Sequence, residues 1–169
     1  FAMTNPSEEE QFLTALGRAL HDWQLVEMAL AKLLASVIRS PDDRVASEMF
    51  YAVQNFRDKV AMVDAAVCLT FWRNAAVLPE WVKLRDALGK KSKRRNRIAH
   101  SHTWEPDEDE GYRLGPHYTL SEVRKAEESP QSAYLTVSQL ASAAESFLRL
   151  SARIGAFDQR VRELLTPRR

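Results

Sequence analysis

Apolar residues recur at steps of three and four along most of this chain, and the 169 residues include only five glycines and seven prolines. This spacing gives a helix one apolar face, so the pattern predicts long amphipathic helices rather than a sheet. The first helix is expected from about Ser7 to Arg39, because Ser7 and Glu10 have the spacing of a capping box. Its apolar face comprises Phe12, Leu16, Leu20, Trp23, Leu30, Leu33, Leu34 and Val37.

Three more helices are expected. The segment 40–43 interrupts the pattern, and a second helix then runs to about Asn74, pairing antiparallel with the first. Pro79 fits the first turn of a third helix, which carries Trp81, Leu84, Leu88 and Ile98 on its apolar side. The fourth is expected from about Ser138 to Leu165. The predicted fold is therefore all-α, an up-down bundle of four to five helices.

The periodicity disappears between His102 and Tyr134, where three prolines and two glycines punctuate a polar segment. Five acidic residues lie between Glu105 and Glu110. We interpret residues 102–134 as an insertion between the third and last helices, with a short hairpin expected from 112–114 and 117–120. Phe1 and Ala2 precede a methionine and are set aside, so the expectation is a single domain over residues 3–169.

The net charge is only +1, so any affinity for nucleic acid must come from a local concentration of charge, which exists at residues 90–97. The single cysteine, Cys68, excludes an internal disulfide, and its apolar neighbours favour a buried, inert thiol. No apolar run is long enough to span a bilayer, and Glu8-Glu9-Glu10 replaces the positive start of a signal peptide. A cytoplasmic protein without membrane contact is the expectation.

The basic run ends in Arg95-Asn96-Arg97-Ile98-Ala99-His100, just where the third helical pattern stops. Arg95 supplies a fixed cation, Asn96 an orienting amide and His100 a proton carrier near neutral pH. These groups suffice to cleave a phosphodiester without a metal. The alternative is a solvated cationic helix face with a histidine near the C-terminal carbonyls, where the helix dipole favours positive charge.

This string, followed by Ser101, resembles the Arg-polar-x-x-x-His signature of HEPN domains, which are small helical bundles of prokaryotic toxins and RNA-processing systems. The long first helix, with His21-Asp22-Trp23-x-x-Val26-Glu27-x-x-Leu30, also resembles the entry helix of such domains. The resemblance implies a metal-independent endoribonuclease that works as a homodimer, with the Arg and His of both subunits facing one cleft. Some members of the family bind without cutting.

The spacing agrees with a shared site. Asn96 and His100 are four residues apart and lie on one helix face, whereas Arg95 and His100 diverge by about 140°. The helix loosens near His100, or the arginine reaches around, or a second subunit supplies the partner group. One His100 would deprotonate the RNA 2′-hydroxyl and the other would protonate the leaving oxygen, while Arg95 stabilises the phosphoryl charge. The products would be a 2′,3′-cyclic phosphate and a 5′-hydroxyl, and DNA should resist.

Further residues are candidates for binding or support. The side chains expected to contact RNA are Lys91, Lys93, Arg94, Arg97 and Trp104, the last by stacking on a base. Glu27 falls on the apolar side of the first helix, so we expect either a pairing with Arg95 or a rim position in water. Ser101 and His102 are candidate neighbours of the site.

No cofactor is expected. His100, His102 and Glu105 lack the spacing of a helical metal site, and no cysteine pair supports one. Trp23 and Trp81 are expected in the core, and His21 and His117 in structural or surface positions.

Two functions remain open at this point. The first is a ribonuclease acting as a toxin or defence effector, for which a cognate antitoxin or a regulatory protein is a further partner. The second is a non-catalytic dimeric module that binds RNA, nucleotide or a protein through the same basic cleft.

Overall fold

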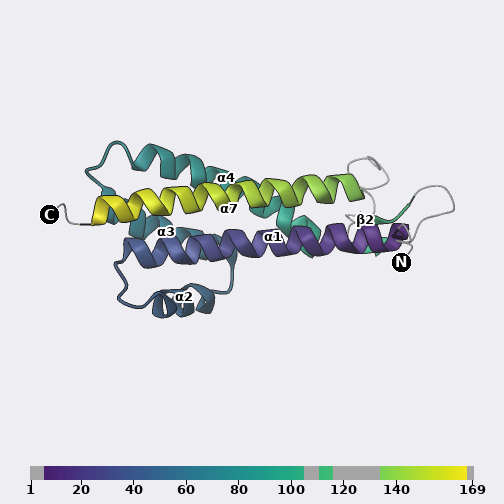
Figure 1. The fold of residues 1–169 in the computed structure, drawn as a ribbon, viewed down its shortest axis with the longest axis horizontal. Helices are drawn as coiled ribbons and strands as arrows, with labels where there is room; N and C mark the ends of the chain where they lie inside the picture. Colours follow the sequence, from purple (N-terminus) through teal and green to yellow (C-terminus); the bar gives the residue numbers. More distant parts are fainter. Residues whose placement is uncertain (1–5, 105–110, 116–133, 167–169) are drawn as a thin grey trace, which may run out of the picture. The chain divides into compact units, whose positions relative to one another are not determined.

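The computed structural model of this chain describes residues 6–104, 111–115 and 134–166. Within them it forms five helices and one small two-stranded sheet, which confirms the predicted all-α helical bundle. The elements are α1 (Glu8–Val37), α2 (Asp43–Ala52), α3 (Phe56–Phe71), α4 (Leu78–Ala99), β1 (His102–Trp104), β2 (Arg113–Gly115) and α7 (Val137–Leu165) (Figure 1). The 105–110 acidic run and the 117–120 half of the expected hairpin lie outside the described residues.

Local signals set both ends of α1. At its start, Ser7 N donates to Glu10 Oε2 (2.8 Å) and Glu10 N donates to Ser7 Oγ (3.2 Å), which confirms the capping box. At its end, Arg39 adopts a left-handed φ of 53° and Ser40 N donates to the carbonyl of Ala35 (2.9 Å). This geometry closes the last turn and stops the helix.

The second predicted helix is wrong as a single element. The structure breaks it into α2 and α3 at residues 53–55, where Val53 is extended and Asn55 caps α3. The Asn55 side chain accepts from Asp58 N (2.8 Å), and this bond replaces an intrahelical partner at the new start. The apolar steps continue across the break, which is why periodicity alone did not reveal it. Glycine in the middle of a helix is unfavourable, but α4 continues through Gly89 without a break.

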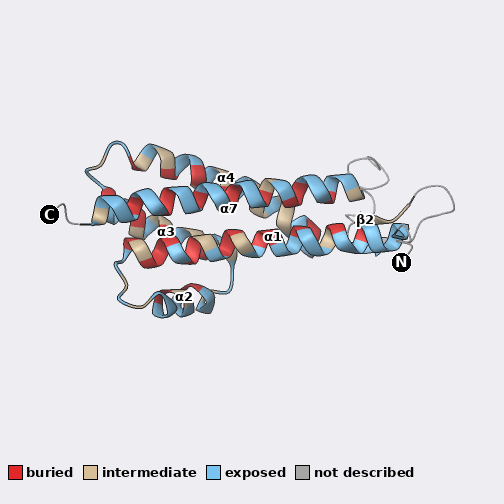
Figure 2. Cartoon of the chain, viewed as in Figure 1, coloured by how far each residue is buried: buried red, intermediate tan, exposed pale blue. Residues whose placement is uncertain are grey.

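The described residues divide into two compact units. Unit 1 comprises residues 1–22 and 93–146, and unit 2 comprises residues 23–92 and 147–169. The helices α1, α4 and α7 each contribute residues to both units. Each unit has buried apolar side chains on one face of its helices (Figure 2).

Unit 2 is built around aromatic side chains. Trp23 of α1 lies edge-on to Phe56 of α3 (4.7 Å between ring centroids) and to Phe147 of α7 (5.1 Å). Trp81 of α4 stacks on Phe157 of α7 (5.9 Å). Both tryptophans are therefore core residues, as predicted, and they join α1, α3, α4 and α7 within this unit.

Unit 1 contains the β ribbon. β1 and β2 pair antiparallel, with His102 opposite Gly115, Thr103 opposite Leu114 and Trp104 opposite Arg113. Residues 113–114 thus do form a strand, but the strand pairs with His102–Trp104. Leu114 also exchanges two main-chain hydrogen bonds with Leu135 (2.9 and 2.8 Å), just before α7. Leu114 and Leu135 are both buried, so this side of the ribbon faces the core of unit 1.

Candidate functional site

The basic end of α4 continues the apolar row of that helix. Trp81, Leu84, Leu88 and Ile98 are buried, and Lys91 and Arg95 occupy the intervening positions of the same three- and four-residue series. Both cations are half-buried, whereas Lys93 and Asn96 are exposed. The charged run is therefore not a uniform solvated face: one side of it points inward and the other outward.

Arg95 reaches around the helix toward Asn96. Its Nη1 donates to Asn96 Oδ1 (3.2 Å), which joins the cation to the residue that shares a helix face with His100. His100 N still donates to the carbonyl of Asn96 (3.0 Å), so the backbone keeps helical geometry up to the histidine. Of the three arrangements that the sequence left open, loosening of the helix does not occur up to His100. The hydrogen bond of Arg95 goes to its sequence neighbour Asn96, so it does not test whether the arginine reaches around to His100. No described residue hydrogen-bonds to the exposed imidazole of His100.

Four further cations lie near this site, and they differ in what they contact. Arg94 Nη2 donates to the main-chain carbonyl of Gln139 in the first turn of α7 (2.8 Å), so Arg94 also fastens α4 to α7 within unit 1. Arg97 is exposed, and burial of part of its guanidinium, followed by the charge of Arg94, lowers the pKa of Arg97. Lys93 is exposed and Lys91 half-buried, so they are not equivalent as phosphate contacts.

The residues after His100 lead directly into the ribbon. Ser101 Oγ donates to the carbonyl of Arg97 (2.5 Å), so this hydroxyl closes the end of α4. His102 is exposed at the start of β1, and the register places Trp104 opposite Arg113. Pairing of the two strands thereby places Arg113 near the end of the motif. The sequence did not single out Arg113, because its position opposite Trp104 depends on strand pairing and not on a local pattern.

Glu27 does not pair with Arg95, and neither predicted alternative is correct. The carboxylate is buried in unit 2, where Oε1 accepts from Trp23 Nε1 (2.9 Å) and Oε2 accepts from Lys59 Nζ (2.7 Å). Lys59 also lies over the ring of Phe50 (5.0 Å). Lys59 occupies the apolar row of α3 beside Val63, and this placement was the available signal that it needed a buried partner. Glu27 is thus a structural residue of unit 2.

Unit 1 holds a second buried carboxylate that the sequence reading missed. Asp22 is buried on α1 beyond Ala15 and Ala19, and its Oδ2 has no hydrogen-bond partner among the described residues. The Nε of Arg95 is likewise buried without such a partner. Two groups of opposite charge in the same unit therefore each keep a polar atom that the described residues do not satisfy, an arrangement more common near functional sites than in ordinary cores.

Cys68 is exposed on α3, so its predicted burial is wrong. Its sulfur lies 3.8 Å from Asp64 Oδ1, and the same oxygen accepts from Trp81 Nε1 (2.7 Å) and Arg85 Nη1 (3.1 Å). Partial burial of the sulfur, and then the Asp64 carboxylate, raise the pKa of Cys68. A raised pKa keeps the thiol protonated, which supports the predicted lack of nucleophilic character.

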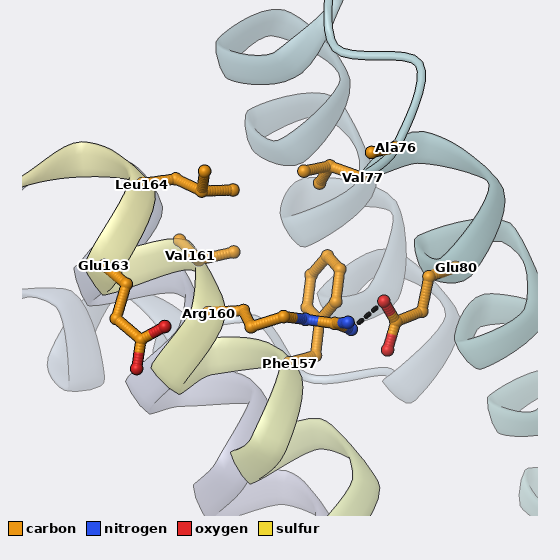
Figure 3. A pocket seen from close by; sticks show the side chains of 8 residues that line it. All are labelled: Ala76, Val77, Glu80, Phe157, Arg160, Val161, Glu163 and Leu164. Atoms are coloured by element: carbon orange, nitrogen blue, oxygen red, sulfur yellow. Dashed lines mark hydrogen bonds and ion pairs between the residues drawn. The ribbon is translucent and has the colours of Figure 1, made fainter.

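One concave region of unit 2 is mainly apolar. It encloses about 340 Å³ between the start of α4 and the end of α7, where Val77, Phe157, Val161 and Leu164 line it. Figure 3 shows Arg160 of α7 directed toward Glu80 of α4, with which it forms an ion pair, while Glu163 points away. None of the predicted site residues lines this pocket.

Within the described ranges, no group of three His, Cys, Asp or Glu side chains could hold a metal ion. The same part of the chain contains no helix that is long and apolar enough to cross a membrane. The chain matches no known family model, no curated protein and no solved structure. The HEPN resemblance therefore rests on the residues of the motif and of the first helix alone.

Proposed function

We propose that the chain is a metal-independent endoribonuclease whose site lies at the C-terminal end of α4. The observation that carries this proposal is the hydrogen bond from Arg95 to Asn96, one helical turn before the exposed His100. A cation, an amide and an imidazole thus lie within six consecutive residues, next to the exposed Lys93 and Arg97. Binding of a phosphate alone would not require the imidazole.

In this mechanism His100 removes the proton of the 2′-hydroxyl, whose oxygen attacks the adjacent phosphorus as the bond to the 5′-oxygen breaks. Arg95 stabilises the negative charge on the phosphoryl oxygens, and a second His100 protonates the leaving 5′-oxygen. The products are a 2′,3′-cyclic phosphate and a 5′-hydroxyl. DNA lacks the nucleophile and is not cleaved.

A homodimer supplies the second histidine. Arg95 is half-buried and His100 is exposed, so one α4 presents one imidazole to solvent. A two-fold axis beside the ends of two α4 helices would bring two imidazoles to one phosphate. In the cell such an activity suits a toxin or defence effector, restrained by an antitoxin or another regulatory protein.

The proposed chemistry is tested by incubating the protein with structured and unstructured RNA in EDTA. We expect cleavage by the wild type and a rate lower by on the order of 10² or more for His100→Ala. The matched control is His21→Ala, another exposed histidine of unit 1, which should cleave normally. A requirement for Mg²⁺, or wild-type cleavage by His100→Ala, would contradict the mechanism.

The proposed dimer is tested by mixing. Light scattering should give twice the chain mass of 19.3 kDa. After subunit exchange with a ninefold excess of His100→Ala, only about a tenth of the wild-type chains keep a wild-type partner. Cleavage per wild-type chain should fall to that level. Undiminished cleavage in the mixture, or a fully active monomer, would contradict the two-histidine site.

A non-catalytic module that binds RNA or nucleotide remains the second proposal. One observation favours it: no described residue hydrogen-bonds to the His100 imidazole to fix its tautomer, as a catalytic base requires. This function predicts salt-dependent RNA binding by the wild type and by His100→Ala alike, with no cleavage by either.

A further inference from the structure

The ion pair between Arg160 of α7 and Glu80 of α4 shows which sides of these two helices meet in unit 2 (Figure 3). Trp81 and Phe157 stack beside this pair, so the start of α4 lies against the end of α7. The two helices run antiparallel (Figure 1). Residues in the same row as the ion pair, on either helix, therefore lie along the line where α4 and α7 meet.

The row of α4 that begins at Glu80 carries two lysines. Lys83, Ala87 and Lys90 follow Glu80 at steps of three and four residues, which places them on one side of the helix. Both lysines are exposed, and neither forms a hydrogen bond or an ion pair with a described residue. Ala87 between them is small and half-buried, so it leaves room for a ligand at this level of the helix.

The row of α7 that ends at Arg160 carries arginines. Arg149, Arg153 and Ala156 precede Arg160 at steps of three and four residues. Arg160 is paired with Glu80, and Arg149 has interactions of its own. Arg153 is exposed and makes no hydrogen bond or ion pair with a described residue, so it adds a third cation without a counter-charge.

These three cations lie along one line. Counting seven residues from the ion pair along each antiparallel helix places Arg153 level with Ala87, between the two lysines. Lys83 and Lys90 are separated by about 10 Å along the helix axis, at about 1.5 Å for each residue. We define the basic seam of unit 2 as Lys83, Lys90 and Arg153.

The neighbouring carboxylates do not neutralise the basic seam. Glu80 is paired with Arg160, and Glu163 points away from that pair (Figure 3). Asp86 is beside the row of α4 and forms its ion pair with Arg85 (4.0 Å between Oδ1 and Nε). Because the net charge of the whole chain is only +1, the basic seam is a local concentration of positive charge.

We propose that the basic seam binds the phosphate backbone of RNA. A line of exposed cations without counter-charges matches a strand of phosphates, and each contact gains free energy from the release of a counterion. Neither of the two rows contains an aromatic residue, so they offer a base no ring on which to stack. The basic seam therefore binds RNA without reading its sequence.

The basic seam deepens the proposed function and rests on it for the identity of the polyanion as RNA. Lys90 is also the first residue of the basic run that leads to His100. Lys83 and Arg153 thus extend the expected RNA contacts beyond that run, by about two turns toward the start of α4.

The test is RNA binding by a triple variant, Lys83→Gln/Lys90→Gln/Arg153→Gln, in a His100→Ala background that prevents cleavage. Fluorescence anisotropy of a labelled single-stranded RNA between about 50 and 200 mM salt gives the slope of log K against log salt. Loss of three phosphate contacts should reduce this slope by about 2 and weaken binding at the lowest salt on the order of 10²-fold. DNA of the same length should show the same losses, because phosphates and not 2′-hydroxyls are contacted.

The matched control removes the same amount of charge from other helices of unit 2. The variant Lys32→Gln/Arg44→Gln/Arg57→Gln changes exposed cations of α1, α2 and α3 and should keep the slope of the His100→Ala protein. Circular dichroism checks that each variant is folded. If the triple variant of the seam is not, Lys83→Gln and Arg153→Gln alone should each reduce the slope by about 0.7.

The outcomes separate the basic seam from the ribonuclease. An unchanged slope in the triple variant, or an equal loss in the control, would overturn the basic seam even if RNA is cleaved. Unchanged RNA binding together with lost binding to vesicles rich in phosphatidylserine would also overturn it and would assign these cations to a membrane surface. A reduced slope in the triple variant alone would support the basic seam even if the protein cuts no RNA.

Discussion

Asp22 and Glu27 lie five residues apart on α1, and both are buried, with 5% and 6% of their surface exposed. Glu27, in unit 2, accepts from Trp23 and Lys59, while Asp22, in unit 1, forms no hydrogen bond or ion pair with a described residue. Asp158 of unit 2 is intermediate, because one of its oxygens accepts from Arg162 (3.0 Å) and the other has no hydrogen-bond partner in the described part of the chain. The three carboxyl groups are buried to a similar extent, but they differ in how many hydrogen bonds and ion pairs they make. Whether a buried carboxylate stabilises the fold depends on these partners.

The largest effect is expected at Glu27. Glu27→Gln should lower the free energy of unfolding by about 3–5 kcal/mol, because it leaves the Lys59 ammonium buried without its counter-charge. The melting temperature should fall by about 10 °C, as followed by circular dichroism.

Asp22→Asn is the matched control for that measurement. It replaces a buried carboxyl group that no described residue pairs with, so the unfolding free energy should change by less than about 1 kcal/mol or rise slightly. Equal losses in the two variants would show that Asp22 has a partner of comparable strength.

Within unit 1, Arg95 and Arg94 are expected to differ in their effects on stability and on cleavage. Arg95→Met keeps an unbranched apolar stem in the half-buried position and removes the buried Nε, so stability should change by less than about 1 kcal/mol. RNA cleavage should fall by on the order of 10² or more, because the phosphoryl charge loses its cation. Arg94→Met should lower stability, since Arg94 bonds to α7, and should weaken RNA binding while leaving the cleavage of bound RNA largely intact. A stability loss in Arg95→Met without a loss of cleavage would make Arg95 a structural residue.

Cys68 provides a smaller test in unit 2. Because its pKa is raised, less thiolate is present at pH 8 than in a free cysteine, and iodoacetamide should modify the folded protein about a few-fold more slowly than the unfolded protein. Asp64→Asn removes the carboxylate that contributes to the shift and should increase the rate in the folded state. No change in that variant would leave burial as the sole cause.

The smallest effect is expected from single lysines. Lys93→Ala should reduce the slope of log K against log salt for RNA binding by about 1, since Lys93 is exposed. Lys91→Ala should change the slope less and the stability more, because Lys91 is half-buried in the apolar row of α4. Equal slopes would mean that Lys91 also contacts phosphate.

Much of the fold was predictable because its signals are local. The capping box at Ser7 and Glu10 and the apolar rows of α1, α4 and α7 each lie within one helix. The break at Asn55 was hidden because Val53, Phe56 and Val60 keep steps of three and four across it. The pairing of β2 with β1 was missed because strand partners are chosen in three dimensions, and the nearer candidate in sequence was expected instead.

Less of the candidate site than of the fold was predictable from the sequence. The inward position of Arg95 follows from its spacing to Leu88 and Ile98, so the sequence contained that information. The partner of Glu27 is 32 residues away on another helix, and no pattern around Glu27 distinguishes Lys59 from Arg95. The position of Arg113 opposite Trp104 depends on the register of the ribbon, which no local sequence pattern predicts.

The bond from Arg94 to α7 has a consequence for sequence divergence. Its acceptor is the main-chain carbonyl of Gln139, which any residue type at that position would present. The side chain of Gln139 performs a separate task, accepting from Thr136 N (3.1 Å) at the start of the helix. A substitution at position 139 would therefore remove the side-chain cap of α7, which lowers stability by about 1 kcal/mol, and would keep the bond between α4 and α7. A substitution at position 94 would remove that bond and keep the cap.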